Sequence, residues 1–161
     1  MGDKKNNGEP AIYKTGLEEI LPLIMEVITV GGVFSFKPSG KSMLPFIREG
    51  LDSVKVASAD SPQKYDIVLY RRHNGQFVLH RIVGVKSTGF VLCGDNQWQK
   101  EYCVTKDMII AQVAEIDRAG RNISVDNKGY RFLVHLWCDF FIVRKFYLRF
   151  RNLVRRMLDG E

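Results

Sequence analysis

Three polar residues of the chain have the types that an acyl-transfer site needs, and each stands at the edge of a predicted β-strand. Ser42 follows the run Ser39–Lys41, His80 lies in LHRIVG, and Asp95 lies in LCGDN. A serine hydroxyl is a weak nucleophile until a base takes its proton, and a neutral imidazole can be that base near pH 7. A carboxylate can fix the imidazole tautomer, and the backbone N–H groups of a glycine-containing turn can hold an oxyanion.

Residue types alone leave a simpler interpretation open. Ser42 could be a turn hydroxyl and His80 a partly buried strand histidine, because single short motifs often match by chance. The surroundings of Ser42 are nevertheless unusual, since the flexible run Ser39–Lys41 is followed at once by the apolar run Met43–Ile47. This composition predicts a turn that packs against the domain and holds Ser42 at a fixed point.

The elements that would position these residues are mainly β-strands. Short β-like runs separated by turn signals extend from Val33 to Arg118, and Asn74-Gly75 between two of them is typical of a hairpin. The pattern predicts a mainly β, antiparallel and partly barrel-like sheet, with a last hairpin over residues 115–125. We expect one domain, 1–161, with an N-terminal helical segment (1–32), a β core (33–127) and a C-terminal amphipathic helix (128–161).

Composition excludes several classes of protein. The chain has 161 residues, of which 45% are hydrophobic and 26% charged, as in ordinary globular proteins. No secretory leader is recognisable, and the most apolar stretch, Leu21–Phe36, contains Glu26 and two glycines. We therefore expect a protein that is not integral to the membrane and is cytoplasmic by default. The three cysteines lack CxxC spacing and predict buried free thiols, with no metal site and no cofactor.

The net charge of +6 lies mainly in the C-terminal segment, where seven cations and one acid, Asp139, fall between Arg131 and Arg156. The predicted helix could cover the sheet, lie on an anionic membrane surface, or contact nucleic-acid phosphates. Its wide apolar face, rich in aromatic residues, favours packing together with peripheral membrane contact and disfavours nucleic acid. Nothing in the sequence indicates an oligomeric state.

Four motifs in order, SGKSMLPFI, YDIVLY, VLHRIVG and CGDN, resemble the signal peptidase I and LexA-like serine peptidase superfamily. The resemblance covers residues 39–115, about half of the chain, and is nearest to small stand-alone members. It implies a serine endopeptidase that cleaves an extended peptide of a protein substrate, with Ser42 as nucleophile. His80 stands where bacterial-type signal peptidases have lysine and the endoplasmic-reticulum type has histidine, and is implied to be the general base.

The resemblance leaves the acid and the substrate contacts open. Asp95 of the CGDN motif is one candidate, and Glu101, near the position of the acid in endoplasmic-reticulum-type enzymes, is the other. Lys41 separates Gly40 from Ser42, so the Ser42 N–H is the chief oxyanion donor that can be proposed. Substrate contacts are predicted at Gly40, Met43 and Phe46, where core packing is the competing interpretation for the apolar residues. The alternative function is a catalytically inactive module that binds a peptide or a membrane-bound partner.

Overall fold

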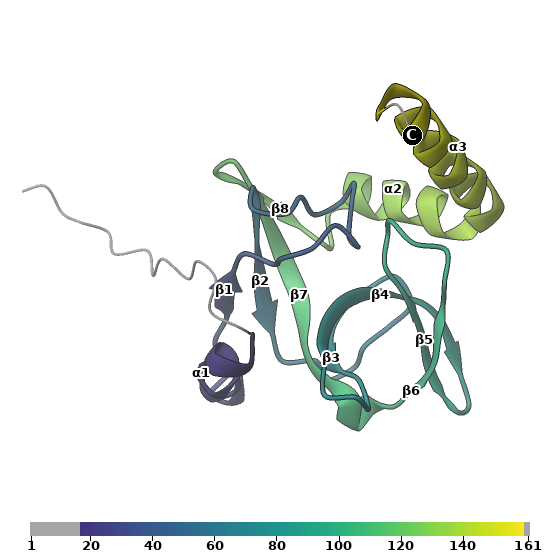
Figure 1. Ribbon diagram of the computed structural model, residues 1–161. Helices are drawn as coiled ribbons and strands as arrows, with labels where there is room; N and C mark the ends of the chain where they lie inside the picture. The colour runs from purple at the N-terminus through teal and green to yellow at the C-terminus, as the bar shows by residue number, and fades with distance from the viewer. Residues whose placement is uncertain (1–16, 160–161) are drawn as a thin grey trace, which may run out of the picture.

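In the computed structural model, which describes residues 17–159, eight strands form one antiparallel sheet (Figure 1). The strand order is β1-β2-β7-β3-β4-β5-β6, and β8 pairs with β7. The strands are β1 (Phe34–Phe36), β2 (Asp52–Ala57), β3 (Ile67–Arg71), β4 (Phe77–Lys86), β5 (Gly89–Cys93), β6 (Glu101–Val104), β7 (Ile109–Arg118) and β8 (Arg121–Ser124).

The mainly β, antiparallel architecture is confirmed, but the sheet is not closed into a barrel. Closure would need β1 to pair with β6, and these short strands of three and four residues stand at opposite ends of the strand order. Both β1 and β6 fall inside the residues 33–118 that the sequence assigns to β-like runs, but the pattern located neither strand individually. The last hairpin, β7 with β8, is where the sequence predicts it.

The hairpin of β3 and β4 sets the face on which His80 lies. Val68 is opposite His80, and Tyr70 is opposite Val78. Since side chains alternate between the faces of a sheet, Tyr70 and His80 lie on the same face as diagonal neighbours.

The N-terminal helix α1 (Leu17–Thr29) packs on the larger of two apolar cores. It contributes Ile20, Ile24 and Ile28, which recur at every fourth residue and so share one side of the helix. Residues 1–16 of the predicted N-terminal helical segment lie outside the described residues.

The C-terminal segment forms two helices, so the prediction of a single helix there is wrong. Helix α2 (Lys128–Asp139) is followed by α3 (Phe141–Asp159), and Phe140 between them has a non-helical backbone with φ −92° and ψ 50°. Asp139 accepts hydrogen bonds from Lys64 and Tyr65, which hold the end of α2 against the loop before β3. No glycine or proline marks the break, and apolar periodicity continues across it.

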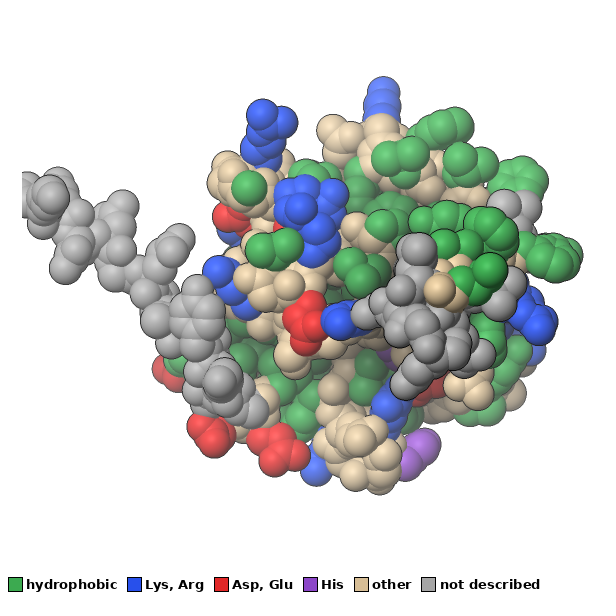
Figure 2. Space-filling view, turned by 45° about the horizontal axis from the view of Figure 1, so that its top comes forward, with side chains coloured by type: hydrophobic (Ala, Val, Ile, Leu, Met, Phe, Trp, Pro, Cys, Tyr) green, Lys and Arg blue, Asp and Glu red, His purple; other side chains and the backbone are tan. Residues whose placement is uncertain are grey.

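Figure 2 shows many hydrophobic side chains gathered over the C-terminal helices. Within residues 17–159, no helix combines the length and the apolar character needed to cross a bilayer. Cys93 and Cys138 are buried free thiols as predicted, whereas Cys103 on β6 is exposed and corrects that prediction.

Candidate active site

His80 lies near the middle of the sheet and is almost completely buried, with 2% of its surface exposed. Its Nδ1 atom lies 3.3 Å from the Tyr70 hydroxyl and 3.3 Å from Oε1 of Glu101. Burial lowers the pKa of His80 to about 4, because desolvation of the imidazolium outweighs the attraction of the Glu101 carboxylate. The ring is therefore neutral near pH 7 and able to accept a proton.

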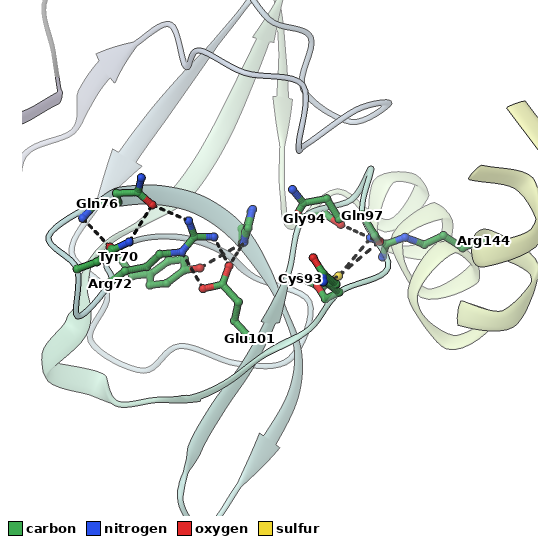
Figure 3. A network of polar contacts seen from close by, with 11 residues as sticks. Tyr70, Arg72, Gln76, Cys93, Gly94, Gln97, Glu101 and Arg144 are labelled. Carbon is green, nitrogen blue, oxygen red and sulfur yellow. Dashed lines mark hydrogen bonds and ion pairs between the residues drawn. The ribbon is translucent and has the colours of Figure 1, made fainter. Parts of the chain in front are cut away.

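Glu101, the first residue of β6, is the carboxylate that faces His80. Arg72 donates to both of its oxygens, with Nε 2.9 Å from Oε2 and Nη2 bonded to Oε1 (Figure 3). Burial favours the neutral acid, but the hydrogen bonds from Arg72 and Tyr70 outweigh it and lower the pKa of Glu101. The ionised carboxylate favours the imidazole tautomer with hydrogen on Nδ1, which leaves Nε2 as the free acceptor.

Ser42 is half-buried in a turn that packs against the core. Its neighbour Met43 and the nearby Ile47 are buried, and the Ile47 N–H donates to the Met43 carbonyl at 2.9 Å. Two hydrogen bonds from Asn96 clamp the turn: its backbone N–H reaches the Ser42 carbonyl at 2.7 Å, and its side-chain amide reaches the Lys41 carbonyl at 2.8 Å. The structure thus joins the SGKSM and CGDN segments directly.

Gly94 marks the point where Ser42 and His80 approach each other. A Cβ atom built on Gly94 would lie 2.8 Å from the Ser42 carbonyl oxygen and 3.0 Å from His80 Nε2. Nε2 and the Ser42 carbonyl oxygen therefore both lie close to Gly94, and Nε2 is the ring nitrogen that does not contact Glu101. Among the described residues, no hydrogen bond joins His80 to the Ser42 hydroxyl. Such bonds are often long in substrate-free enzymes and shorten when substrate is bound.

Asp95, the other candidate acid, does not face Nδ1 of His80. Its carboxylate is fully buried and pairs with Arg81 through two bonds, of 2.9 and 2.7 Å. Arg81 also donates to the Tyr65 carbonyl at 2.7 Å and to the Tyr130 hydroxyl at 3.1 Å. Both oxygens of Asp95 are occupied by this ion pair, which ties the turn after β5 to β4 and so supports the position of Ser42.

The C-terminal helices hold the same turn from the other side. Trp137 of α2 donates its indole N–H to the Asp95 carbonyl at 3.0 Å. Arg144 of α3 is buried and donates to the carbonyls of Gly94 and Gln97 (Figure 3). The turn that presents the CGDN motif is therefore fixed by β4, α2 and α3 together.

The predicted substrate contacts fall in three different places. Met43 is 4% exposed and belongs to the core, which favours core packing, the competing interpretation of this residue. Gly40 is exposed, with φ +93°, and its N–H donates to Glu49 at 2.7 Å. Phe46 is half-buried, stacks on the Arg81 guanidinium at 4.9 Å, and lines a groove of about 800 Å³ between the Ser42 turn and the C-terminal helices.

Tyr70 and Arg72 were not predicted as site residues, although the sequence carries a signal for both. They lie two residues apart at the end of one predicted strand, and Asn74-Gly75 marks the turn that fixes the hairpin register. Counting back from that turn would have placed Tyr70 on the face of His80. The partner of Arg72 could not be found in this way, because Glu101 belongs to a distant strand.

In the part of the chain that the structure describes, no group of three His, Cys, Asp or Glu side chains could hold a metal ion. Comparison of the chain with protein-family models, with curated proteins and with solved structures gave no match.

Proposed function

We propose that the protein is a serine endopeptidase of the signal-peptidase and LexA-like type, with Ser42 as nucleophile and His80 as general base. The observation that carries the proposal is the two-sided environment of His80. Its Nδ1 lies 3.3 Å from the Glu101 carboxylate, and its Nε2 lies near Gly94, which the Ser42 carbonyl also approaches. On unrelated folds, an imidazole placed between an acid and a serine hydroxyl activates that hydroxyl as a nucleophile.

In the proposed reaction, Nε2 of His80 takes the proton of the Ser42 hydroxyl as Oγ attacks the peptide carbonyl. Glu101, held by Arg72, stabilises the imidazolium that forms. The Ser42 N–H donates to the carbonyl oxygen as it becomes an oxyanion. The imidazolium then protonates the leaving amine, and an acyl-enzyme remains. A water molecule, activated by His80, hydrolyses the acyl-enzyme, which releases the carboxylic acid of the cleaved peptide and restores the Ser42 hydroxyl.

The substrate that fits this sheet is an extended peptide. β1 pairs with β2 on one side only among the described strands, and its chain continues into the Ser42 turn. An extended peptide can add to a free strand edge through main-chain hydrogen bonds, while pockets accept alternate side chains. This mode of binding would carry the scissile bond along β1 toward Ser42.

The proposal is tested by cleavage of a synthetic peptide library, with products identified by mass spectrometry. Ser42→Ala is expected to reduce cleavage by about a thousandfold or more, since the nucleophile and its base act as a unit. Ser39→Ala, at an exposed position three residues upstream, is the matched control and should cleave as the native chain does. Cleavage retained in Ser42→Ala would refute the assignment.

A binding module without catalysis is the second candidate, favoured by the lack of a hydrogen bond between the Ser42 hydroxyl and His80 among the described residues. It predicts that a library peptide is bound by the native chain without being cut. It also predicts that Ser42→Ala leaves the affinity for that peptide unchanged.

A further inference from the structure

Helices α2 and α3 present large apolar side chains to solvent. We call six of them the C-terminal apolar surface, and each is more than half exposed: Phe132, Leu136, Phe140, Ile142, Phe146 and Phe150. They extend over both helices, in the region where Figure 2 shows hydrophobic side chains gathered. Exposed apolar side chains gathered in this way indicate an interaction site rather than the ordinary scatter of single exposed residues.

The spacing on α3 shows that packing within the domain does not account for this surface. Ile142, Phe146 and Phe150 recur at every fourth residue and form one stripe, with exposed fractions of 72%, 69% and 66%. The side of α3 that meets the domain is a different one, where Arg144 and Leu148 are buried. The helix therefore has an inner face already covered and an outer apolar stripe that faces solvent.

The positive charge beside the apolar stripe of α3 indicates an anionic binding partner. Lys145 and Arg149 are exposed and follow Ile142 and Phe146 at three-residue intervals, so they flank the stripe on one side. Helices α2 and α3 contain eight Lys and Arg, of which Arg144 is buried, against two acids, Asp139 and Asp159. Asp139 already binds Lys64 and Tyr65. Apolar side chains bordered by cations suit an interface of lipid acyl chains below anionic headgroups. A second copy would bring two cationic surfaces together.

We propose that the C-terminal apolar surface lies in the interface of an anionic lipid bilayer, with α2 and α3 along the membrane plane. The six side chains of the C-terminal apolar surface enter the boundary between headgroups and acyl chains. Lys145 and Arg149 contact the headgroups. Neither helix crosses the bilayer, in keeping with their sequences. This binding does not depend on the proposed peptidase activity and can be measured with the Ser42→Ala chain.

The test is co-sedimentation of the full chain with vesicles of phosphatidylglycerol and phosphatidylcholine, with pure phosphatidylcholine vesicles as the comparison. The native chain should bind the anionic vesicles, and added salt should weaken the binding. Ile142→Ser with Phe146→Ser removes exposed apolar groups and should lower the affinity at least about tenfold. Lys145→Glu with Arg149→Glu should lower it by a similar factor for anionic vesicles.

Matched controls distinguish binding through this surface from non-specific effects of exposed apolar residues or of net charge. Leu51→Ser with Val85→Ser removes apolar groups that are 65% and 58% exposed on other elements and should leave vesicle binding unchanged. Arg71→Glu with Lys86→Glu makes the same charge change on the exposed ends of β3 and β4 and should have at most a small effect. Circular dichroism confirms that each variant is folded.

Two results would overturn the proposal. One is the failure of the native chain to bind anionic vesicles at low salt. The other is binding that the Ile142 and Phe146 substitutions leave unchanged. If vesicles are not bound but those substitutions convert a dimer into a monomer in analytical ultracentrifugation, the surface is an interface between copies of the chain instead.

Discussion

In the proposed reaction, burial of His80 would disfavour its charged form if nothing offset the loss of water. Glu101 offsets part of this loss, since its carboxylate lies 3.3 Å from Nδ1 and is kept ionised by Arg72, but burial still lowers the His80 pKa to about 4. The site therefore contains four linked side chains: Arg72 binds Glu101, and both Tyr70 and Glu101 contact Nδ1 of His80. Nε2 of His80 lies near Gly94, next to the Ser42 turn. The motifs indicated Ser42 and His80, but the sequence could not choose between Asp95 and Glu101. The structure separates the two candidates, because Glu101 lies next to His80 whereas Asp95 pairs with Arg81, the next residue of β4.

The pH dependence of cleavage tests the contact between Glu101 and His80. A protonated imidazole cannot accept the Ser42 proton, so kcat/KM of the native chain should fall as the pH drops through the His80 pKa of about 4. Because the Glu101 anion raises the His80 pKa, Glu101→Gln should move this acidic limb to lower pH. It should also lower kcat/KM by about 100-fold or more.

Glu115→Gln is the control for Glu101→Gln, since Glu115 forms a partly exposed ion pair with Lys55 on neighbouring strands. It should leave both kcat/KM and the acidic limb in place. An acidic limb that stays where it is in Glu101→Gln would mean that Glu101 does not act on His80 in solution.

At the scale of elements, the turn between β5 and β6 is the part that brings the site together. Arg81 holds it from β4, Trp137 and Arg144 hold it from the C-terminal helices, and Asn96 within it holds the Ser42 turn. Turn signals located most strands of the sheet, because alternation and Asn-Gly pairs are local features. Such local features could not reveal β6, where Glu101 binds Arg72 of a distant segment. Nor could they reveal the break between α2 and α3, where Asp139 binds Tyr65.

Gly94→Ala tests the closeness of the turn to both catalytic candidates. The new methyl group would meet the Ser42 carbonyl oxygen at 2.8 Å and His80 Nε2 at 3.0 Å, which is too close unless one of them moves. We expect a loss of about 1–3 kcal/mol in the free energy of unfolding, typical of an overpacked site, together with loss of cleavage. Denaturant unfolding and the peptide-library assay measure the two effects.

Gly84→Ala is the matched substitution, because a Cβ atom at Gly84 would meet only Val91, at 3.7 Å, an ordinary contact. It should change neither stability nor cleavage by much. Native stability and activity in Gly94→Ala would contradict the close approach of the Ser42 turn to His80.

In the whole molecule, helix α1 and the C-terminal helices α2 and α3 differ in what they contact. Helix α1 covers the larger core through three isoleucines, whereas α2 and α3 fix the turn after β5 on their inner side and leave an apolar outer side exposed. The basic and aromatic composition of the C-terminal segment predicted an amphipathic element. It did not predict that Arg144 would be buried against the Gly94 carbonyl, because that contact requires the bend at Phe140.

If His80 activates Ser42 as proposed, chemical modification of the serine reveals it without knowledge of the substrate. The full chain is incubated with a fluorophosphonate, and the modified residue is located by peptide mapping with mass spectrometry. We expect a covalent adduct at Ser42 of the native chain that forms at least about 100-fold more slowly in His80→Gln, because the hydroxyl then lacks its base. No adduct at Ser42, or modification of His80→Gln at the native rate, would contradict it.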